Sequence, residues 1–187
     1  MILELAVRTV YTFTIDDKTL DRLLSDNINP GNERKVNIVA YSIFKINEDK
    51  TLVKMVVGTD DPNNIHRGGA GGPLNPDENM SNDLQNFQFM QNLKKLNIKY
   101  SKKPIIQVFS VDTKGTVGVY RILYRELVRA GITIISSFPG EYVIRIPIMS
   151  CKCKDGSINY KQTGSEFFEV PEDQISIAIK SLKKINI

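Results

Sequence analysis

Two short stretches of the sequence are alike: residues 13–18 read Phe-Thr-Ile-Asp-Asp-Lys, and residues 109–114 read Phe-Ser-Val-Asp-Thr-Lys. The same offset of 96 positions places residues 36–39 on residues 132–135, and both of these stretches are rich in Val and Ile. An internal repeat at a fixed offset indicates that one structural unit occurs twice in the chain. Chance similarity between apolar strands is the alternative, and the equal spacing of the two matched blocks argues against it.

Each copy predicts the same order of elements. The first block is rich in β-branched and aromatic residues that alternate with polar ones, which favours a strand over 8–16 and over 105–112. A helix with apolar residues at helical spacing follows. Asp16 or Asp17 is suited to cap its start in the first copy, and Gly131 is suited to end it in the second. Two strands and a second helix complete a β-α-β-β-α segment in each copy.

The later elements complete the predicted architecture. They are strands over 36–46 and 51–58, a long Gly-rich loop over 59–79, a helix over about 81–96, a linker over 99–104, strands over 132–137 and 142–149, an extra hairpin over 151–170 and a closing helix from Pro171. The order is typical of an α+β fold with two ferredoxin-like βαββαβ sandwiches in tandem, each with helices on one face of an antiparallel sheet. The expected repeats are residues 1–100 and 104–187. The final strand of the first copy is too short to place, so residues 105–111 serve both copies in the alternative arrangement.

The second copy resembles a known family. Residues 106–115 form a strand that ends in Asp-Thr-Lys-Gly, and after the predicted helix residues 129–134 read Arg-Ala-Gly-Ile-Thr-Ile. This pattern resembles the ACT domain, in which strand-Asp-x-x-Gly precedes an amphipathic helix and then Ala-Gly-hydrophobic-x-hydrophobic. In the first copy, Val-Asn-Ile at 36–38 resembles the matching strand start, although Lys35 replaces the family's Gly. The chain is also similar in size to tandem ACT regulatory proteins.

The resemblance implies a non-enzymatic regulatory or sensor protein that binds a small anionic metabolite, such as an amino acid, and needs no cofactor. Backbone N–H groups at a helix start attract a carboxylate, and a Gly in the preceding turn lets it approach closely. The ligand-binding residues expected in the second copy are Asp112, Gly115, Thr116, Val117 and Gly118. The first copy has two acids and no Gly at 16–19, so it is the poorer host. A plain helix cap is the alternative role for Asp112.

A glycine-rich loop is the second candidate site. It contains His66, Arg67, Gly68 and Gly69, and such a loop is able to cradle a phosphate group. The loop therefore supports an alternative function, an enzyme that acts on a phosphate-bearing substrate. It matches neither a P-loop nor the dinucleotide fingerprint, and an exposed loop without a function is the simpler interpretation.

Composition narrows the function classes. The net charge of +4 falls short of the basic footprint of nucleic-acid binders, so we expect no nucleic-acid partner. One His and two Cys are too few for most zinc sites, and the spacing of Asp60, Asp61 and Glu166 does not demand a divalent cation, so we expect no metal. The longest apolar runs are too short to span a membrane, and the first residues do not read as a signal peptide, which predicts a cytoplasmic protein. A protein-interaction module without a small ligand stays open, and self-association as a homodimer is its simplest form.

Overall fold

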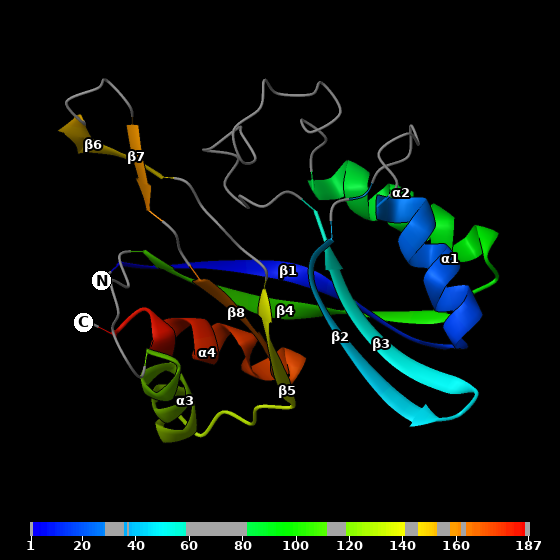
Figure 1. The fold of residues 1–187 in the computed structure, drawn as a ribbon. Helices are drawn as coiled ribbons and strands as arrows, with labels where there is room; N and C mark the ends of the chain where they lie inside the picture. The colour runs from blue at the N-terminus through cyan, green and yellow to red at the C-terminus, as the bar shows by residue number, and fades with distance from the viewer. Residues whose placement is uncertain are drawn as a thin grey trace. The chain divides into compact units, whose positions relative to one another are not determined.

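The structure is a computed structural model of the 187-residue chain, and it describes residues 2–28, 36, 38–58, 82–111, 119–140, 146–152, 158–161 and 164–185. These residues form a mixed α/β fold with an antiparallel sheet and four α-helices, as expected (Figure 1). The elements are β1 (Ile2–Ile15), α1 (Asp17–Ile28), β2 (Ile38–Asn47), β3 (Lys50–Val57), α2 (Asn82–Lys95), β4 (Tyr100–Val111), α3 (Val119–Arg129), β5 (Ser136–Gly140), β6 (Ile146–Lys152), β7 (Ile158–Lys161), β8 (Gly164–Glu169) and α4 (Ile175–Leu182). No helix in this part of the chain is long and apolar enough to cross a membrane.

Six of the described strands form one sheet in the order β2-β3-β1-β4-β8-β5. Phe13 of β1 lies opposite Val53 of β3, and Phe109 of β4 lies opposite Ser165 of β8. Strand β3 also pairs with β2, and β8 also pairs with β5, both antiparallel. Each β-α-β-β-α segment therefore pairs its first strand with its third and its third with its second.

The described residues fall into two compact units. The α1/α2 unit comprises the described residues between 9 and 103, and the α3/α4 unit comprises residues 2–8 together with the described residues from 104 to 185. Strands β1 and β4 thus contribute residues to both units. The predicted linker at 99–104 is wrong, because residues 100–104 belong to the continuous strand β4. Ser101, Lys102 and Lys103 are exposed, so this part of the strand has the polar composition of a linker.

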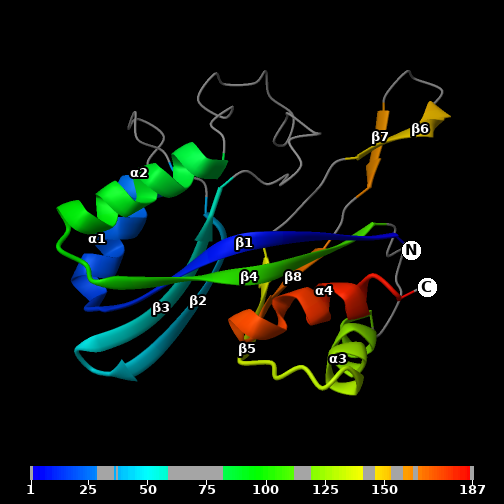
Figure 2. The ribbon, with the colours of Figure 1, turned by 180° about the vertical axis from the view of Figure 1, so that it is seen from behind.

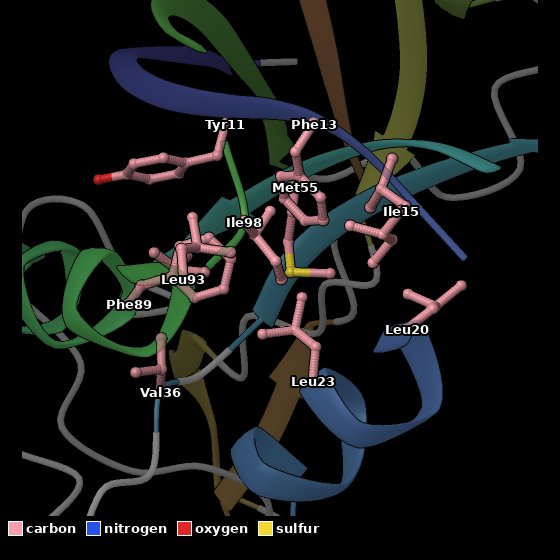
Figure 3. Close-up of a cluster of buried hydrophobic side chains, with 12 residues drawn as sticks. Tyr11, Phe13, Ile15, Leu20, Leu23, Val36, Met55, Phe89, Leu93 and Ile98 are labelled. Carbon is pink, nitrogen blue, oxygen red and sulfur yellow. The ribbon is translucent and has the colours of Figure 1, made fainter. Parts of the chain in front are cut away.

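The core of the α1/α2 unit lies between its two helices and one face of its strands (Figure 3). Its members include Tyr11, Phe13, Ile15, Leu20, Leu23, Val53, Met55, Phe89 and Leu93. The rings of Tyr11 and Phe89 meet edge to face with centroids 5.0 Å apart, and the Tyr11 hydroxyl donates to Asn86 Oδ1 at 2.8 Å. Burial, with a further effect of Tyr100, raises the pKa of Tyr11 to about 12. Leu84 and Phe87 of α2 are exposed, although both are large apolar residues.

The core of the α3/α4 unit is built in the same way, with α3 and α4 on one side of β4 and β8 (Figure 2). Its members include Ile106, Val108, Val119, Leu123, Leu127, Phe168, Ala178 and Leu182. Ile132 and Ile134 join it, as Val36 and Ile38 join the other core, so the offset of 96 is correct for this block. The offset is wrong for the first strands. In β1 the odd-numbered residues enter the core of the α1/α2 unit, whereas in β4 the even-numbered residues enter the core of the α3/α4 unit. Because 96 is an even number, the offset would place odd-numbered residues of both strands on the same face.

The position of the extra hairpin also differs from the expectation. It was expected over 151–170, with a main-sheet strand over 142–149, but β6 and β7 form the hairpin and β8 belongs to the main sheet. Phe167 and Phe168 point to opposite faces of β8, and both are fully buried. A strand buried on both faces belongs inside a sheet, which is why β8 joins β4 and β5.

The end of α3 follows the prediction that Gly131 terminates it. Gly131 has a φ of 72°, its N–H donates to the carbonyl of Val128, and the N–H of Ile132 donates to the carbonyl of Leu127, both at 3.0 Å. This pair of bonds is the Schellman motif, in which a left-handed residue ends the helix. The Ala-Gly-Ile part of the ACT-like pattern therefore has a structural reason, since it turns the chain from α3 toward β5.

Candidate functional site

The residues expected to bind the ligand are not among those the structure describes. Asp112, Gly115, Thr116, Val117 and Gly118 lie outside the described residues, as do His66, Arg67, Gly68 and Gly69 of the second candidate site. The first set lies in the sequence between the end of β4 at Val111 and the start of α3 at Val119. The surroundings of α3 are described, and so are those of α1, the matching helix of the first copy.

The start of α1 is occupied by two carboxylates of the chain itself. Asp16 accepts hydrogen bonds from the backbone N–H and from the hydroxyl of Thr19, both at 2.8 Å, and the N–H bond contributes most to lowering the pKa of Asp16. Asp17 accepts from the Lys45 ammonium and from Thr51 Oγ1, at 2.9 Å for the latter, and both lower its pKa. A second anion would meet two negative charges and a backbone donor already in use, so this helix start is poorly suited to an anionic ligand.

The first turns of α3 lie over a buried carboxylate. Glu166 of β8 is only 7% exposed, and its partners across the sheet are Val108 of β4 and Pro139 of β5. The Ser137 side chain hydrogen-bonds to Glu166, and the Tyr124 hydroxyl forms a hydrogen bond with Ser137 Oγ. Burial, and then the charge of Glu166, raises the pKa of Tyr120 in the first turn of α3. Tyr120 of α3 and Ser137 of β5 thus lie near this carboxyl group, and Tyr124 is linked to it through Ser137.

The Glu166 carboxylate has no cationic partner in the described part of the chain. Burial raises its pKa above the ordinary value of 4.5, and the hydrogen bond from Ser137 opposes this effect only in part. Nor do three His, Cys, Asp or Glu side chains gather among the described residues to hold a metal ion. A buried glutamate is rare without a partner, because removing its charge from water is costly.

Sequence reasoning gives this group no role. The sequence presents Glu166 only as an isolated oxygen ligand, and the expected hairpin over 151–170 places it outside the main sheet. The available signal is the stretch Ser-Glu-Phe-Phe-Glu at 165–169, in which an acid stands between residues typical of a buried strand. Its association with Ser137 and Tyr124 follows from the pairing of β5 with β8 and from the packing of the Tyr124 ring on Phe168, with centroids 5.2 Å apart.

No protein-family model and no curated protein matches the sequence. Solved structures match it in fold. Protein BT0572 from Bacteroides thetaiotaomicron has a TM-score of 0.56 at 11% identity, over 96% of this chain and 89% of that chain. A structure of aspartokinase alpha and beta subunits has a TM-score of 0.50 at 11% identity, over 98% and 96%. The ligand-free regulatory subunit of aspartate kinase from Thermus thermophilus has a TM-score of 0.47 at 9% identity, over 96% and 93%.

The first two likenesses show a shared fold along almost the whole chain. Aspartokinase subunits of this kind are ACT-domain proteins, so the resemblance drawn from residues 106–134 is confirmed at the level of the fold. The matches to these two structures extend over both units of the chain.

Proposed function

We propose that the chain is a non-enzymatic regulatory or sensor protein with two ferredoxin-like, ACT-like repeats. It binds a small anionic metabolite, such as an amino acid, at Asp112, Gly115, Thr116, Val117 and Gly118. In this proposal the α1/α2 unit takes its last strand from the start of β4, and the α3/α4 unit takes its last strand from residues 2–8. The observation that carries the proposal is the fold shared with aspartokinase subunits over nearly the full length.

The contrast between the two helix starts supports placing the ligand in the second copy. Asp16 and Asp17 already take hydrogen bonds at the start of α1. The sequence before α3 has Gly115 and Gly118, which leave backbone N–H groups accessible to a ligand. A thermal-shift screen with amino acids, nucleotides and phosphorylated metabolites tests the proposal, because a ligand at 100 times its dissociation constant stabilises a protein by about 2.7 kcal/mol. Absence of any shift across the whole screen would contradict the proposed ligand class.

The substitution Gly115→Val is expected to weaken binding of the metabolite found in that screen by about tenfold or more, which is about 1.4 kcal/mol. A branched side chain would obstruct the approach of the anionic end to the backbone. Thr19→Val is the matched control, because it leaves the Thr19 N–H bonded to Asp16 and should leave binding almost unchanged. Calorimetry measures both affinities, and circular dichroism checks that both variants fold. Equal losses in the two variants would refute the asymmetry between the copies.

A second candidate function, pairing with another copy of the chain, is favoured by the edge strand β2. This strand lies at one end of the sheet order and exposes four large apolar side chains: Tyr41, Ile43, Phe44 and Ile46. An exposed apolar edge strand is a ready partner for another strand. We expect light scattering at micromolar concentration to give about twice 21.1 kDa, and Phe44→Lys to shift the protein toward the single-chain mass. A 21.1 kDa species for the unchanged protein at every concentration would exclude the homodimer.

A further inference from the structure

Helices α3 and α4 expose a cluster of cations. The two helices lie side by side in the α3/α4 unit (Figure 2), and Ser181 Oγ of α4 donates to the backbone carbonyl of Glu126 on α3 at 3.3 Å. This bond places the last turn of α4 beside the second half of α3. The exposed cations are Arg121, Arg125 and Arg129 on α3, Lys180 in the last turn of α4, and Lys183 and Lys184 directly after it. We call these six residues the basic helical face.

The stability of α3 does not account for its cations. Arg121 is the third residue of the helix, and a positive charge in the first turn interacts unfavourably with the helix dipole. Arg121 and Arg125 are also four residues apart, a spacing at which like charges repel each other on a helix. The matching helix of the first copy, α1, exposes two acids and two bases: Asp17, Lys18, Asp21 and Arg22. The fold therefore does not require a basic helix at this place, which favours a role in binding.

The arginines of α3 keep donors available for a partner. Glu126 is the one acid in α3 and α4, and its Oε1 lies 3.4 Å from Arg125 Nε and 3.0 Å from Arg129 Nη1. The two Arg side chains nevertheless stay 53% and 65% exposed, and each guanidinium group has further N–H donors. Two more exposed acids, Glu172 and Asp173, precede α4 at the end away from its lysines. Positive charge thus predominates where α4 ends beside α3.

Two exposed apolar side chains indicate which kind of anionic partner fits. Val128 of α3 is 65% exposed, and Ile177 of α4 is 54% exposed. A nucleic-acid backbone presents phosphates to cations but offers no apolar group to these two side chains. Protein interfaces combine apolar contacts with Arg, and the net charge of +4 also falls short of that of most nucleic-acid binders. An acidic protein segment with apolar residues is therefore the better match.

We propose that the basic helical face, together with Val128 and Ile177, binds an acidic amphipathic helix of a partner protein. Carboxylates of the partner would pair with the guanidinium groups, which accept them in bidentate geometry. Apolar side chains of the same helix would cover Val128 and Ile177. This surface consists of α3 and α4 alone, so the proposal does not depend on binding of the metabolite.

Calorimetry with a synthetic helical peptide that carries Glu and Leu side by side on one face tests the proposal. The double variant Arg121→Glu, Arg125→Glu should bind this peptide at least tenfold more weakly, which is about 1.4 kcal/mol. The matched control is Lys94→Glu, Lys95→Glu at the exposed end of α2, which changes the net charge equally in the α1/α2 unit and should keep most of the affinity. Equal losses in the two double variants would show that net charge alone attracts the peptide and would overturn the proposal.

Thermal unfolding separates binding from a structural role of Arg121. Arg121→Glu replaces a cation by an anion in the first turn of α3, so it should leave the Tm unchanged or raise it while it weakens peptide binding. A lower Tm together with the lost binding would mean that Arg121 serves the fold, and it would overturn the proposal.

Two further probes test the class of the partner. Val128→Ser should weaken binding of the Glu/Leu peptide but not of poly-L-glutamate, because only the first offers apolar side chains. A DNA duplex of about 20 base pairs, roughly two helical turns, represents the nucleic acids. Tighter binding of this duplex than of the peptide, lost in Arg121→Glu, Arg125→Glu, would assign the surface to nucleic acid and overturn the proposal. Failure of the unchanged protein to bind the peptide would overturn it as well.

Discussion

Replacing Phe168 with alanine is expected to lower the free energy of unfolding of the α3/α4 unit by about 3–5 kcal/mol, the range for truncating a fully buried aromatic residue. The Phe168 side chain is completely buried, belongs to the core of this unit and meets the Tyr124 ring edge to face. Its removal leaves a cavity between the sheet and α3, next to Glu166 on the same strand. Urea unfolding followed by circular dichroism and tyrosine fluorescence measures the loss, since the chain has no Trp.

The matched control is Phe87→Ala on α2. Phe87 is 53% exposed, so its truncation should change the free energy of unfolding by no more than about 0.5 kcal/mol. Equal losses in the two variants would contradict the burial of Phe168. A loss confined to Phe87→Ala would mean that α2 presents its other side to the core.

The second large effect is expected from Gly140→Ala, at about 1–3 kcal/mol of destabilisation. A Cβ atom on Gly140 would overlap Ser165 Oγ and would lie 2.6 Å from Cε2 of Phe167, well inside van der Waals contact. Because Phe167 is fully buried and its ring stacks on Phe138 with centroids 5.7 Å apart, it has little room to move. Urea unfolding of the variant measures the cost.

A comparison with Gly131→Ala distinguishes steric crowding at Gly140 from backbone strain. A Cβ atom on Gly131 would have no neighbour within 4 Å, but its φ of 72° costs an L-residue about 1–2 kcal/mol. Adding Ser165→Ala removes one of the two overlaps at Gly140 and should recover part of the lost stability there, and none at Gly131. Recovery in neither double variant would contradict the crowding at Gly140.

The elements whose pattern is local follow from the sequence. The alternation before Asp16, the helical spacing of Leu20 and Leu23, and Gly131 at the end of α3 each act within a few residues, and each has the expected structure. The block at 36–38 and 132–134 is also correct, because both segments turn the same residues toward their cores.

The features that depend on residues far apart in the chain could not be predicted from the sequence. The polar residues at 101–103 have the composition of a linker, and only the pairing of β4 with its neighbours makes them part of a strand. The face parity of β1 and β4 depends on which side the helices cover, so a gapless comparison of the two stretches misses it. The same limit explains the displaced hairpin, since β8 is recognised by burial on both faces rather than by its alternation.

The candidate site also has parts that the sequence predicts and parts that it does not. The Asp-x-x-Gly motif and the two acids before α1 are adjacent residues, so the expected contrast between the copies could be formulated from the sequence. The group of Glu166, Ser137 and Tyr124 combines β8, β5 and α3, and no spacing in the sequence brings these three together. A site that depends on the register of two strands becomes visible only when the strands are paired.

The sharing of β1 between the two units has a consequence for synthesis on the ribosome. Residues 2–8 are made before the rest of the described chain, but the unit they complete has its other described residues from 104 onward. At about 5–20 residues per second, on the order of 5–20 s pass before the first of those residues appears. The α1/α2 unit has its own residues complete by position 103, so it is able to fold while the nascent strand 2–8 still lacks its unit. The order of translation thus favours folding of the α1/α2 unit first, and the α3/α4 unit then forms around a strand that was made well before the rest of that unit.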